Sequence, residues 1–301
     1  MIKLSIMQVG AGGTGSWFAR TLAQMLCQFN DVHKNLLKVH WGIYDYDVIE
    51  KRNLLRQPFL AGIGTPKAIF LAETLKSLFD INGWEQRNVD VRPEINMLRG
   101  EALAIAVSRM CETARIVGTD IELCLIVSCV DNTYTRTILE ETIAKFPQKY
   151  VYYVNMGVSP EGDWYAERID GESLIPTKYD ELSYPDAMLS CGQRAETTPV
   201  PQTTYSNIMA GAMAAHMVNK LLGEVTNDLE SNPILCIEGK DFTTKDISEL
   251  YLPVHIADVA AAAQAAEEKK AEEISTTTTE NVEEHNDESI DEESDLASLL
   301  R

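Results

Sequence analysis

The chain has 301 residues, of which 45% are hydrophobic, and it is therefore long enough to bury one large core or two smaller ones. Its net charge is −20, and half of this excess lies in residues 267–301, which carry 13 acidic and 3 basic side chains. No part of the chain shows a basic stripe, so we expect no nucleic acid among its partners. The six cysteines form no CxxC pair and no charged-then-apolar leader opens the chain, which predicts a reduced, cytoplasmic protein.

Strand-like and helix-like segments alternate over the first 156 residues. The predicted strands cover residues 4–9, 39–44, 88–91, 123–129 and 150–156, and the predicted helices cover residues 14–28, 66–78, 101–111 and 133–146. Near-continuous apolar strands separated by helices are typical of a parallel sheet that is covered on both faces. The sequence therefore predicts an α/β fold with a doubly wound, Rossmann-like, mostly parallel sheet and helices on both faces.

The segments that follow predict an antiparallel C-terminal extension of the sheet. Asp163–Ile169 reads as a strand that pairs with Tyr150–Met156 in a hairpin. Residues 170–204 show no clear period, which is typical of a functional or binding loop. The apolar pattern of Tyr205–Leu222 is interrupted by polar residues, which favours a buried helix over a membrane span, so we expect no membrane partner.

The composition changes near the C-terminus. An Ala-rich stretch begins at Ala260, and it is followed by a threonine run and by acidic low-complexity sequence. Such a segment has too few apolar residues to offset the entropy of ordering it. We therefore predict a folded domain over residues 1–256 and an acidic, largely disordered tail over residues 257–301.

A glycine-rich loop joins the first predicted strand to the first predicted helix. Its sequence is Gly10-Ala11-Gly12-Gly13-Thr14-Gly15. Glycines allow a tight turn with close backbone approach, and the free N–H groups and dipole of the helix N-terminus favour an anion. The loop therefore predicts a cradle for nucleotide phosphate, although many dehydrogenases carry the same signature.

An acidic pair follows the second predicted strand. In a dinucleotide-binding fold, a carboxylate at this point accepts hydrogen bonds from the ribose hydroxyls. Asp45 occupies this position and Asp47 is the second candidate. The alternative for either residue is an aspartate that caps the loop.

A polar and cationic cluster comes next in the chain, formed by Asn53, Arg56, Gln57 and Lys67. Such a cluster suits a polyphosphate, because Arg and Lys neutralise the charge that develops during phosphoryl chemistry. Hydride transfer has no use for it. Pro66 at the first helical position would place Lys67 in the first turn, where a cation opposes the helix dipole. A solvated lysine is the alternative there.

Asp131 and Asn132 lie just after the apolar strand that ends at Cys129. The carboxyl ends of strands are where ligands bind in doubly wound sheets, and a carboxylate there can hold Mg²⁺ between phosphates. Alternatively, one of the two residues caps the helix that contains Arg136. The two roles are compatible.

Taken in chain order, these elements resemble the ThiF/MoeB family of adenylyltransferases, the superfamily of ubiquitin-activating enzymes. The matching residues are the glycine loop, Asp45-x-Asp47-Val48, Asn53-Leu54-x-Arg56-Gln57, Gly64-x-x-Lys67-Ala68 and Asp131-Asn132. The resemblance implies that ATP and Mg²⁺ bind at the glycine loop, within an adenylation domain over residues 1–256. It also implies that the C-terminal glycine of a small ubiquitin-like or sulfur-carrier protein becomes an acyl-adenylate, and that the enzyme is a homodimer.

The resemblance assigns roles to single residues. Asp45 would bind the ribose, Asn53, Arg56 and Lys67 would contact phosphates, and Asp131 would hold the metal or lie beside the α-phosphate. Gly10, Gly12, Gly13, Gly15, Asp47, Gln57 and Asn132 complete the expected nucleotide site.

Two features depart from or extend the family pattern. Relatives often hold a structural zinc with two CxxC pairs, and because none is present here we expect no zinc. Leu189-Ser190-Cys191 resembles the place where some relatives carry a reactive cysteine. Cys191 lies between Ser and Gly in a polar loop and is therefore the best candidate nucleophile for a thioester. An incidental loop thiol is the alternative.

The first hypothesis is therefore ATP- and Mg-dependent adenylation of a protein C-terminal glycine. One alternative is adenylation of a small-molecule or tRNA-linked carboxylate. Another is a nucleotide-binding scaffold without catalysis, which the intact Asn53, Arg56, Lys67 and Asp131 argue against. An NAD-dependent dehydrogenase would leave the segment 53–57 unexplained.

Overall fold

The computed structural model describes residues 1–33, 36–54, 62–84, 88–96, 98–118, 120–146, 148–159, 163–177, 204–227 and 234–239, all within one compact unit, Met1–Asp241. The predicted tail lies outside the described residues. The predicted domain boundary at residue 256 therefore stays a prediction.

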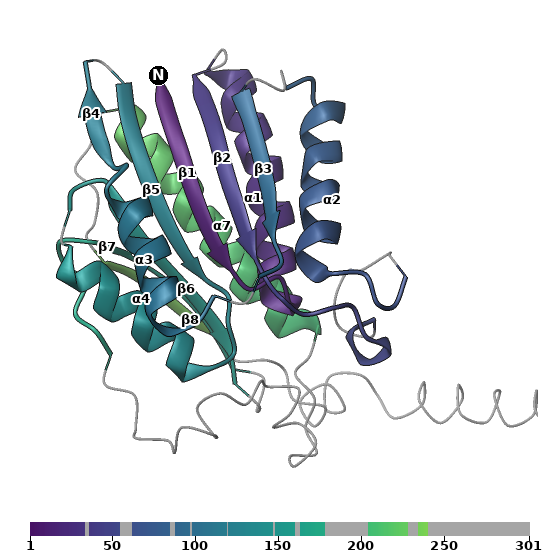
Figure 1. Cartoon of the computed structure of the whole chain (residues 1–301). Helices are drawn as coiled ribbons and strands as arrows, with labels where there is room; N and C mark the ends of the chain where they lie inside the picture. Colours follow the sequence, from purple (N-terminus) through teal and green to yellow (C-terminus); the bar gives the residue numbers. More distant parts are fainter. Residues whose placement is uncertain are drawn as a thin grey trace, which may run out of the picture. The chain divides into compact units, whose positions relative to one another are not determined.

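A single sheet forms the centre of this unit (Figure 1). Its parallel strands are β1 (Ile2–Val9), β2 (Leu37–Tyr44), β3 (Val89–Glu94), β5 (Asp120–Ser128) and β6 (Val151–Val158), in the order β3-β2-β1-β5-β6. Strand β7 (Trp164–Asp170) pairs antiparallel with β6, and β8 (Ile234–Gly239) pairs antiparallel with β7. The predicted doubly wound, mostly parallel sheet with an antiparallel extension is confirmed.

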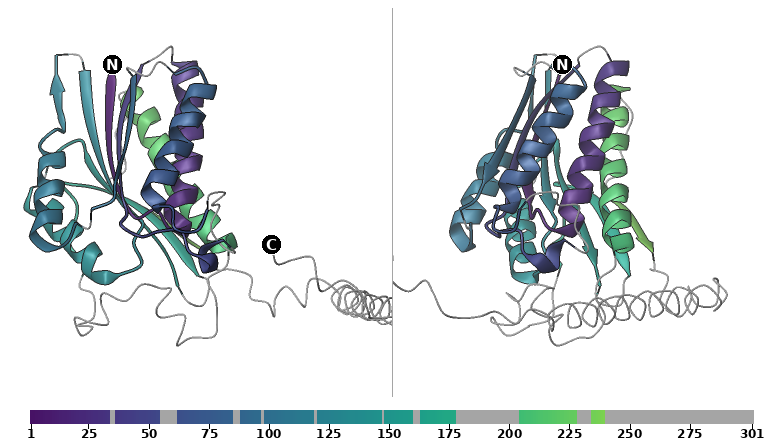
Figure 2. Two further views of the ribbon diagram at one scale, coloured as in Figure 1. Left: turned by 45° about the vertical axis from the view of Figure 1, so that its right-hand side comes forward. Right: turned by 90° about the vertical axis from the view of Figure 1, so that its right-hand side faces the viewer.

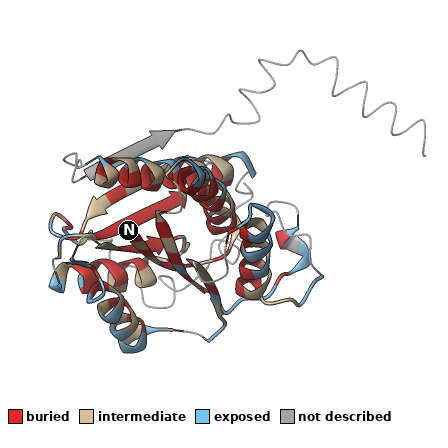
Figure 3. Cartoon of the chain, turned by 90° about the horizontal axis from the view of Figure 1, so that it is seen from above, coloured by how far each residue is buried: buried red, intermediate tan, exposed pale blue. Residues whose placement is uncertain are grey.

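Helices cover both faces of the sheet (Figure 2). One face carries α1 (Gly13–Val32), α2 (Lys67–Ile81) and α7 (Thr204–Thr226), and the other carries α3 (Gly100–Cys111) and α4 (Thr133–Lys145). Because side chains alternate along a strand, Ile6 enters the core on the first face and Met7 enters the core on the second. Viewed from above, the buried residues lie between the sheet and its helices (Figure 3).

The observed elements differ from the predicted ones in detail. Strand β4 (Arg115–Val117) was not predicted, because its three residues are too few to show an alternating pattern. Pro66 is the N-cap of α2 and Lys67 is its first residue, so the prediction that Pro66 is the first helical residue is wrong by one position. Helix α7 is buried against α1 and the sheet, and no helix in the described part of the chain is long and apolar enough to cross a membrane.

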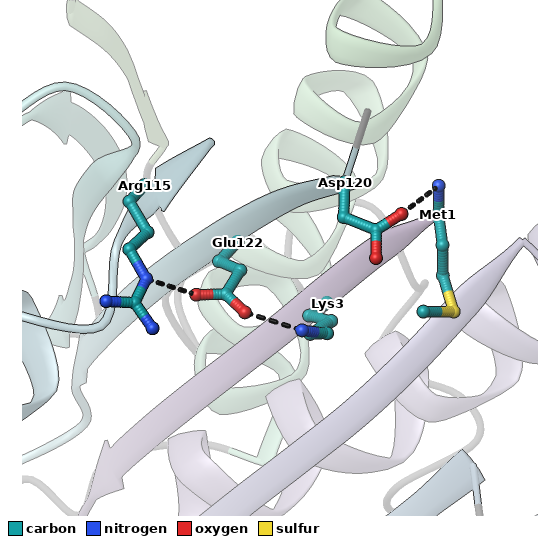
Figure 4. Close-up of polar contacts among 5 residues, drawn as sticks. All are labelled: Met1, Lys3, Arg115, Asp120 and Glu122. Carbon is teal, nitrogen blue, oxygen red and sulfur yellow. Dashed lines mark hydrogen bonds and ion pairs between the residues drawn. The ribbon is translucent and has the colours of Figure 1, made fainter. Parts of the chain in front are cut away.

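Ion pairs join three strands at the end of the sheet where β1 begins (Figure 4). Glu122 accepts from Lys3 Nζ at 2.6 Å and from Arg115 Nε at 3.0 Å, and the Met1 amino group lies 3.1 Å from Asp120 Oδ1. These contacts tie β1, β4 and β5 together at their common end. The glycine loop and Asp131 lie at the opposite end of the sheet, where β1 and β5 end.

Candidate functional site

The glycine loop and the Asp131 turn leave neighbouring strands. Strands β1 and β5 are paired, and the amide of Cys129 donates to the carbonyl of Val9 at 2.8 Å. The chain then runs to α1 on one face and to α4 on the other. This reversal is the switch point at which ligands bind in doubly wound sheets.

Packing within the protein requires three of the loop glycines. Gly10 has φ = +102°, and a Cβ there would lie 2.7 Å from the carbonyl oxygen of Cys129. A Cβ on Gly15 would lie 2.3 Å from the carbonyl oxygen of Gly10, and one on Gly13 would lie 2.9 Å from Cγ of Asn207. The loop is therefore held by contacts with the turn after β5 and with α7.

Gln8 supports the loop from beneath. Its Nε2 donates to the carbonyls of Gly10 at 2.9 Å and Gly15 at 3.0 Å, and its Oε1 accepts from the indole N–H of Trp41 at 3.1 Å. Gln8 is fully buried, so these bonds satisfy a polar group inside the core. We did not predict this role from the sequence, although a glutamine in an apolar strand directly before the loop is a usable signal.

The N-terminus of α1 has no side-chain cap. Gly12 is the N-cap residue and cannot supply a cap, and the first turn contains no acidic residue. The first amides of a helix have no partner within the helix, so those of Gly13, Thr14 and Gly15 are directed past its end. Together with the helix dipole, they make this end suited to an anion such as phosphate.

Asp45 bonds directly to the glycine loop. Its Oδ2 accepts from the amide of Ala11 at 2.6 Å, and its Oδ1 accepts from the amide of Asp47 at 2.8 Å. Burial raises the pKa of Asp45 to about 6, against the lowering effects of nearby Lys67 and of the two backbone bonds. An ionised Asp45 still has lone pairs to accept from ribose hydroxyls.

Asp47 pairs with Lys67. The Lys67 ammonium lies 3.0 Å from Asp47 Oδ2, and the amide of Lys67 donates to the carbonyl of Asp47 at 2.9 Å. A bridge between Val48 and Pro66 holds the two segments antiparallel. Lys67 is buried whereas Asp47 is half exposed, so the aspartate is the counter-ion of a buried cation beside the loop.

Of the remaining residues of the predicted phosphate cluster, the structure describes Asn53. Asn53 is buried in a short 3-10 helix, η1 (Lys51–Asn53), where its Oδ1 accepts from the amide of Glu50 at 2.9 Å. Its carboxamide oxygen therefore caps this turn. Arg56 and Gln57 lie outside the described residues.

Asn132 is the N-cap of α4. Its Oδ1 accepts from the amide of Thr135 at 2.8 Å, so the cap of this helix belongs to Asn132. Asp131 is exposed at the end of the sheet that carries the glycine loop. Among the described residues, no group of three or more His, Cys, Asp or Glu side chains lies close enough to hold a metal ion.

Arg136 fixes the turn that carries Asp131. Its buried guanidinium donates to Asn155 Oδ1, the Tyr165 hydroxyl and the carbonyls of Val130 and Met156. These acceptors lie on β6, β7 and the end of β5. The sequence indicated Arg136 only as a helix residue, because its partners are distant in the chain.

Cys129 lies closest to the glycine loop among the described cysteines. It is half-buried, and burial raises the pKa of its thiol well above the ordinary value, so it is not a thiolate at neutral pH. The predicted nucleophile, Cys191, lies outside the described residues.

The chain is similar to several solved structures. The structure of E. coli MccB with ATP gives 15% sequence identity and a TM-score of 0.47, over 79% of this chain and 62% of the MccB chain. The structure of E. coli MccB with MccA-N7isoASN gives 15% identity and a TM-score of 0.46, over 79% and 64%. HcgE from Methanothermobacter marburgensis with guanylylpyridinol and ATP gives 14% identity and a TM-score of 0.40, over 73% and 95%. The chain thus spans less than two thirds of the MccB length, and a sequence search of curated proteins gave no match.

The family comparison covers most of the chain. A model of the ThiF family matches residues 2–249, which include the glycine loop and every residue of the predicted site. This match confirms the resemblance found in the sequence, and the chain belongs to the ThiF family.

Proposed function

We propose that this protein adenylates the C-terminal glycine of a small ubiquitin-like or sulfur-carrier protein, using ATP and Mg²⁺. The observation that carries the proposal is the uncapped N-terminus of α1, bonded through Ala11 to Asp45 and flanked by the buried Lys67. These contacts support an anion-binding helix end, a ribose acceptor and a phosphate counter-charge at the switch point of a ThiF-family sheet.

In the proposed reaction, a carboxylate oxygen of the glycine attacks the α-phosphorus of ATP. A new O–P bond forms, the bond from the α-phosphorus to the oxygen bridging to the β-phosphate breaks, and pyrophosphate leaves. The amides of Gly13 and Thr14 and the Lys67 ammonium stabilise the negative charge on the phosphates. Arg56 is proposed to add a second cation, and Asn53 and Gln57 to add polar contacts.

Asp131 is the proposed metal ligand. Mg²⁺ is commonly bound through one or two carboxylates together with substrate phosphates, so a single exposed aspartate beside the loop fits such a site. The bound ion would neutralise phosphate charge. The proposed site contains no zinc, in keeping with the absence of CxxC pairs from the sequence.

Cys191 is proposed to accept the acyl group from the adenylate as a thioester. The Cys191 thiolate would attack the acyl carbon of the adenylate, a C–S bond would form, and AMP would leave. Incubation with ATP and the partner should then give a reducible adduct that Cys191→Ser abolishes while pyrophosphate exchange continues. An adduct that persists in Cys191→Ser would contradict this step.

Nucleotide binding tests the proposal at its base. Purified protein should bind ATP with Mg²⁺ more tightly than NADH in a calorimetric titration, and gel filtration should give the mass of the proposed homodimer. Tight NADH binding without ATP binding would contradict the adenylation function and favour a dehydrogenase.

A further inference from the structure

Helix α7 packs along α1, the helix that begins at the glycine loop. Figures 1 and 2 show the two helices side by side on one face of the sheet. The contact is close: a Cβ on Gly211 would lie 2.6 Å from the amide nitrogen of Phe18 and 2.8 Å from the carbonyl oxygen of Thr14. The backbone of α7 at Gly211 therefore lies close against the backbone of the first turns of α1.

One polar side chain of α7 reaches the loop itself. Asn207 is 2% exposed, and its Oδ1 accepts from the Thr14 hydroxyl at 2.8 Å. The same carboxamide lies where a Cβ on Gly13 would be, within 3.0 Å of that position by all three of its terminal atoms. Asn207 thus bonds to one loop residue and packs on the residue before it, from 193 positions further along the chain.

These contacts act on the amides that the proposed function assigns to phosphate. Gly13 and Thr14 are the first two residues of α1, and no side-chain cap holds that turn. A helix end without a cap frays more readily, and an anion site is effective only when its donors are already in place. Asn207 supplies from the side the restraint that a capping residue supplies in other helices.

We propose that Asn207 is a positioning residue for ATP binding, which holds the Gly13–Thr14 turn through the Thr14 hydroxyl and through packing on Gly13. This inference rests on the proposed function, because ATP is the ligand whose phosphates the turn would bind. It assigns a role at the nucleotide site to α7.

The test compares two truncations on α7. Asn207→Ala removes the contact with the loop, whereas Val218→Ala removes a fully buried apolar side chain further along the helix. Both should lower the melting temperature. Asn207→Ala should raise the dissociation constant for ATP about tenfold, the worth of one hydrogen bond, and Val218→Ala should leave it within about twofold.

A double-mutant cycle distinguishes positioning from direct contact. Thr14→Val should weaken ATP binding about as much as Asn207→Ala does. The double variant should bind ATP no less tightly than the single variant that binds it less tightly, because both substitutions remove the same bond. If Asn207→Ala does not fold, Thr14→Val alone should still weaken binding relative to Val218→Ala.

The outcomes separate the inference from the proposed function. If the unmodified protein binds ATP and Asn207→Ala binds it as tightly as Val218→Ala does, the inference is wrong and the proposed function stands. Additive effects of Asn207→Ala and Thr14→Val on ATP binding would also overturn the inference. If the unmodified protein binds no ATP in the presence of MgCl₂, the proposed function fails and the inference fails with it.

Discussion

The ammonium of Lys67 lies 3.0 Å from Asp47 Oδ2, and this pair joins the first residue of α2 to the turn after β2. The lysine is buried and its partner is half exposed. The exposed aspartate can give way to a phosphate as the partner of the buried cation. A buried cation of this kind beside an uncapped helix end is suited to binding a phosphate chain.

Replacing the lysine should therefore harm activity far more than replacing its partner. Lys67→Ala should lower pyrophosphate exchange by about 10²–10³-fold, because it removes a charge that stabilises the transition state. Asp47→Asn keeps that charge and should lower exchange less than about tenfold. Lys76→Ala, an exposed lysine on the same helix, is the control and should have no effect. Equal losses in Lys67→Ala and Lys76→Ala would remove Lys67 from the site.

The pKa of Asp45 gives the site a pH dependence. Because burial raises this pKa to about 6, the carboxyl group becomes protonated as the pH falls through 6 and loses part of its capacity to accept from ribose. The dissociation constant for ATP should rise as the pH is lowered from 7 to 5, and this rise should be smaller in Asp45→Asn. A titration of ATP binding at several pH values measures it.

The same group affects stability with a defined sign. Its folded pKa is above the unfolded value of 3.8, so between pH 4 and 6 the folded state binds more protons than the unfolded state. The contribution of Asp45 to the free energy of unfolding should therefore fall as the pH rises across this window. Urea unfolding of the unmodified protein and of Asp45→Asn at pH 4.5 and 7 gives the difference, and the opposite sign would mean that the group is stabilised as a carboxylate.

The sequence predicted the fold because the fold depends on local patterns. Apolar strands separated by amphipathic helices and glycine turns are read within short windows, and each of the predicted strands up to Ile169 is present. Strand β4 was missed because three residues are too few to show such a pattern. The glycine loop, Asp45 and Lys67 were predicted because each lies at a recognisable place relative to its own strand or helix.

The contacts that support the site could not be predicted in the same way. The partners of Gln8, Arg136 and Asn207 lie on other elements and are set by the packing of the whole sheet. The sequence gives the chemical type of such a residue, but the pairing follows from the tertiary structure. Loop glycines illustrate this: Gly13 is explained by the side chain of Asn207 as well as by its own motif.

Loop packing leads to a prediction about stability. Gly13→Ala should destabilise the protein by about 1–3 kcal/mol, because its Cβ would lie 2.9 Å from Cγ of Asn207. Combining it with Asn207→Ala should recover part of that loss, since the obstructing side chain is gone. Gly15→Ala meets backbone at 2.3 Å and should not be rescued by Asn207→Ala. Thermal unfolding of the three single variants and the two double variants makes the comparison.

Two arginines at opposite ends of the sheet should differ in how much they contribute to the free energy of unfolding. Arg136→Met should cost about 3 kcal/mol or more, because it leaves buried acceptors on β6 and β7 without their donor. Arg115→Ala should cost less than about 1 kcal/mol, because Arg115 is 66% exposed in its pair with Glu122. Chemical denaturation of both variants tests this ranking, and similar losses would show that the Arg136 network is not a structural anchor.

Pyrophosphate exchange that depends on a protein C-terminal glycine tests the proposed adenylation directly. The assay contains this protein, ATP, MgCl₂ and labelled pyrophosphate, with small ubiquitin-like and sulfur-carrier proteins as probes, beginning with any glycine-ended product of a neighbouring reading frame. Each probe is used intact and with its last glycine removed. We expect exchange with at least one intact probe, none with its truncated form, and a loss of about 10²–10³-fold in Lys67→Ala. Exchange that is equal with intact and truncated probes, or that small carboxylates alone support, would contradict this expectation.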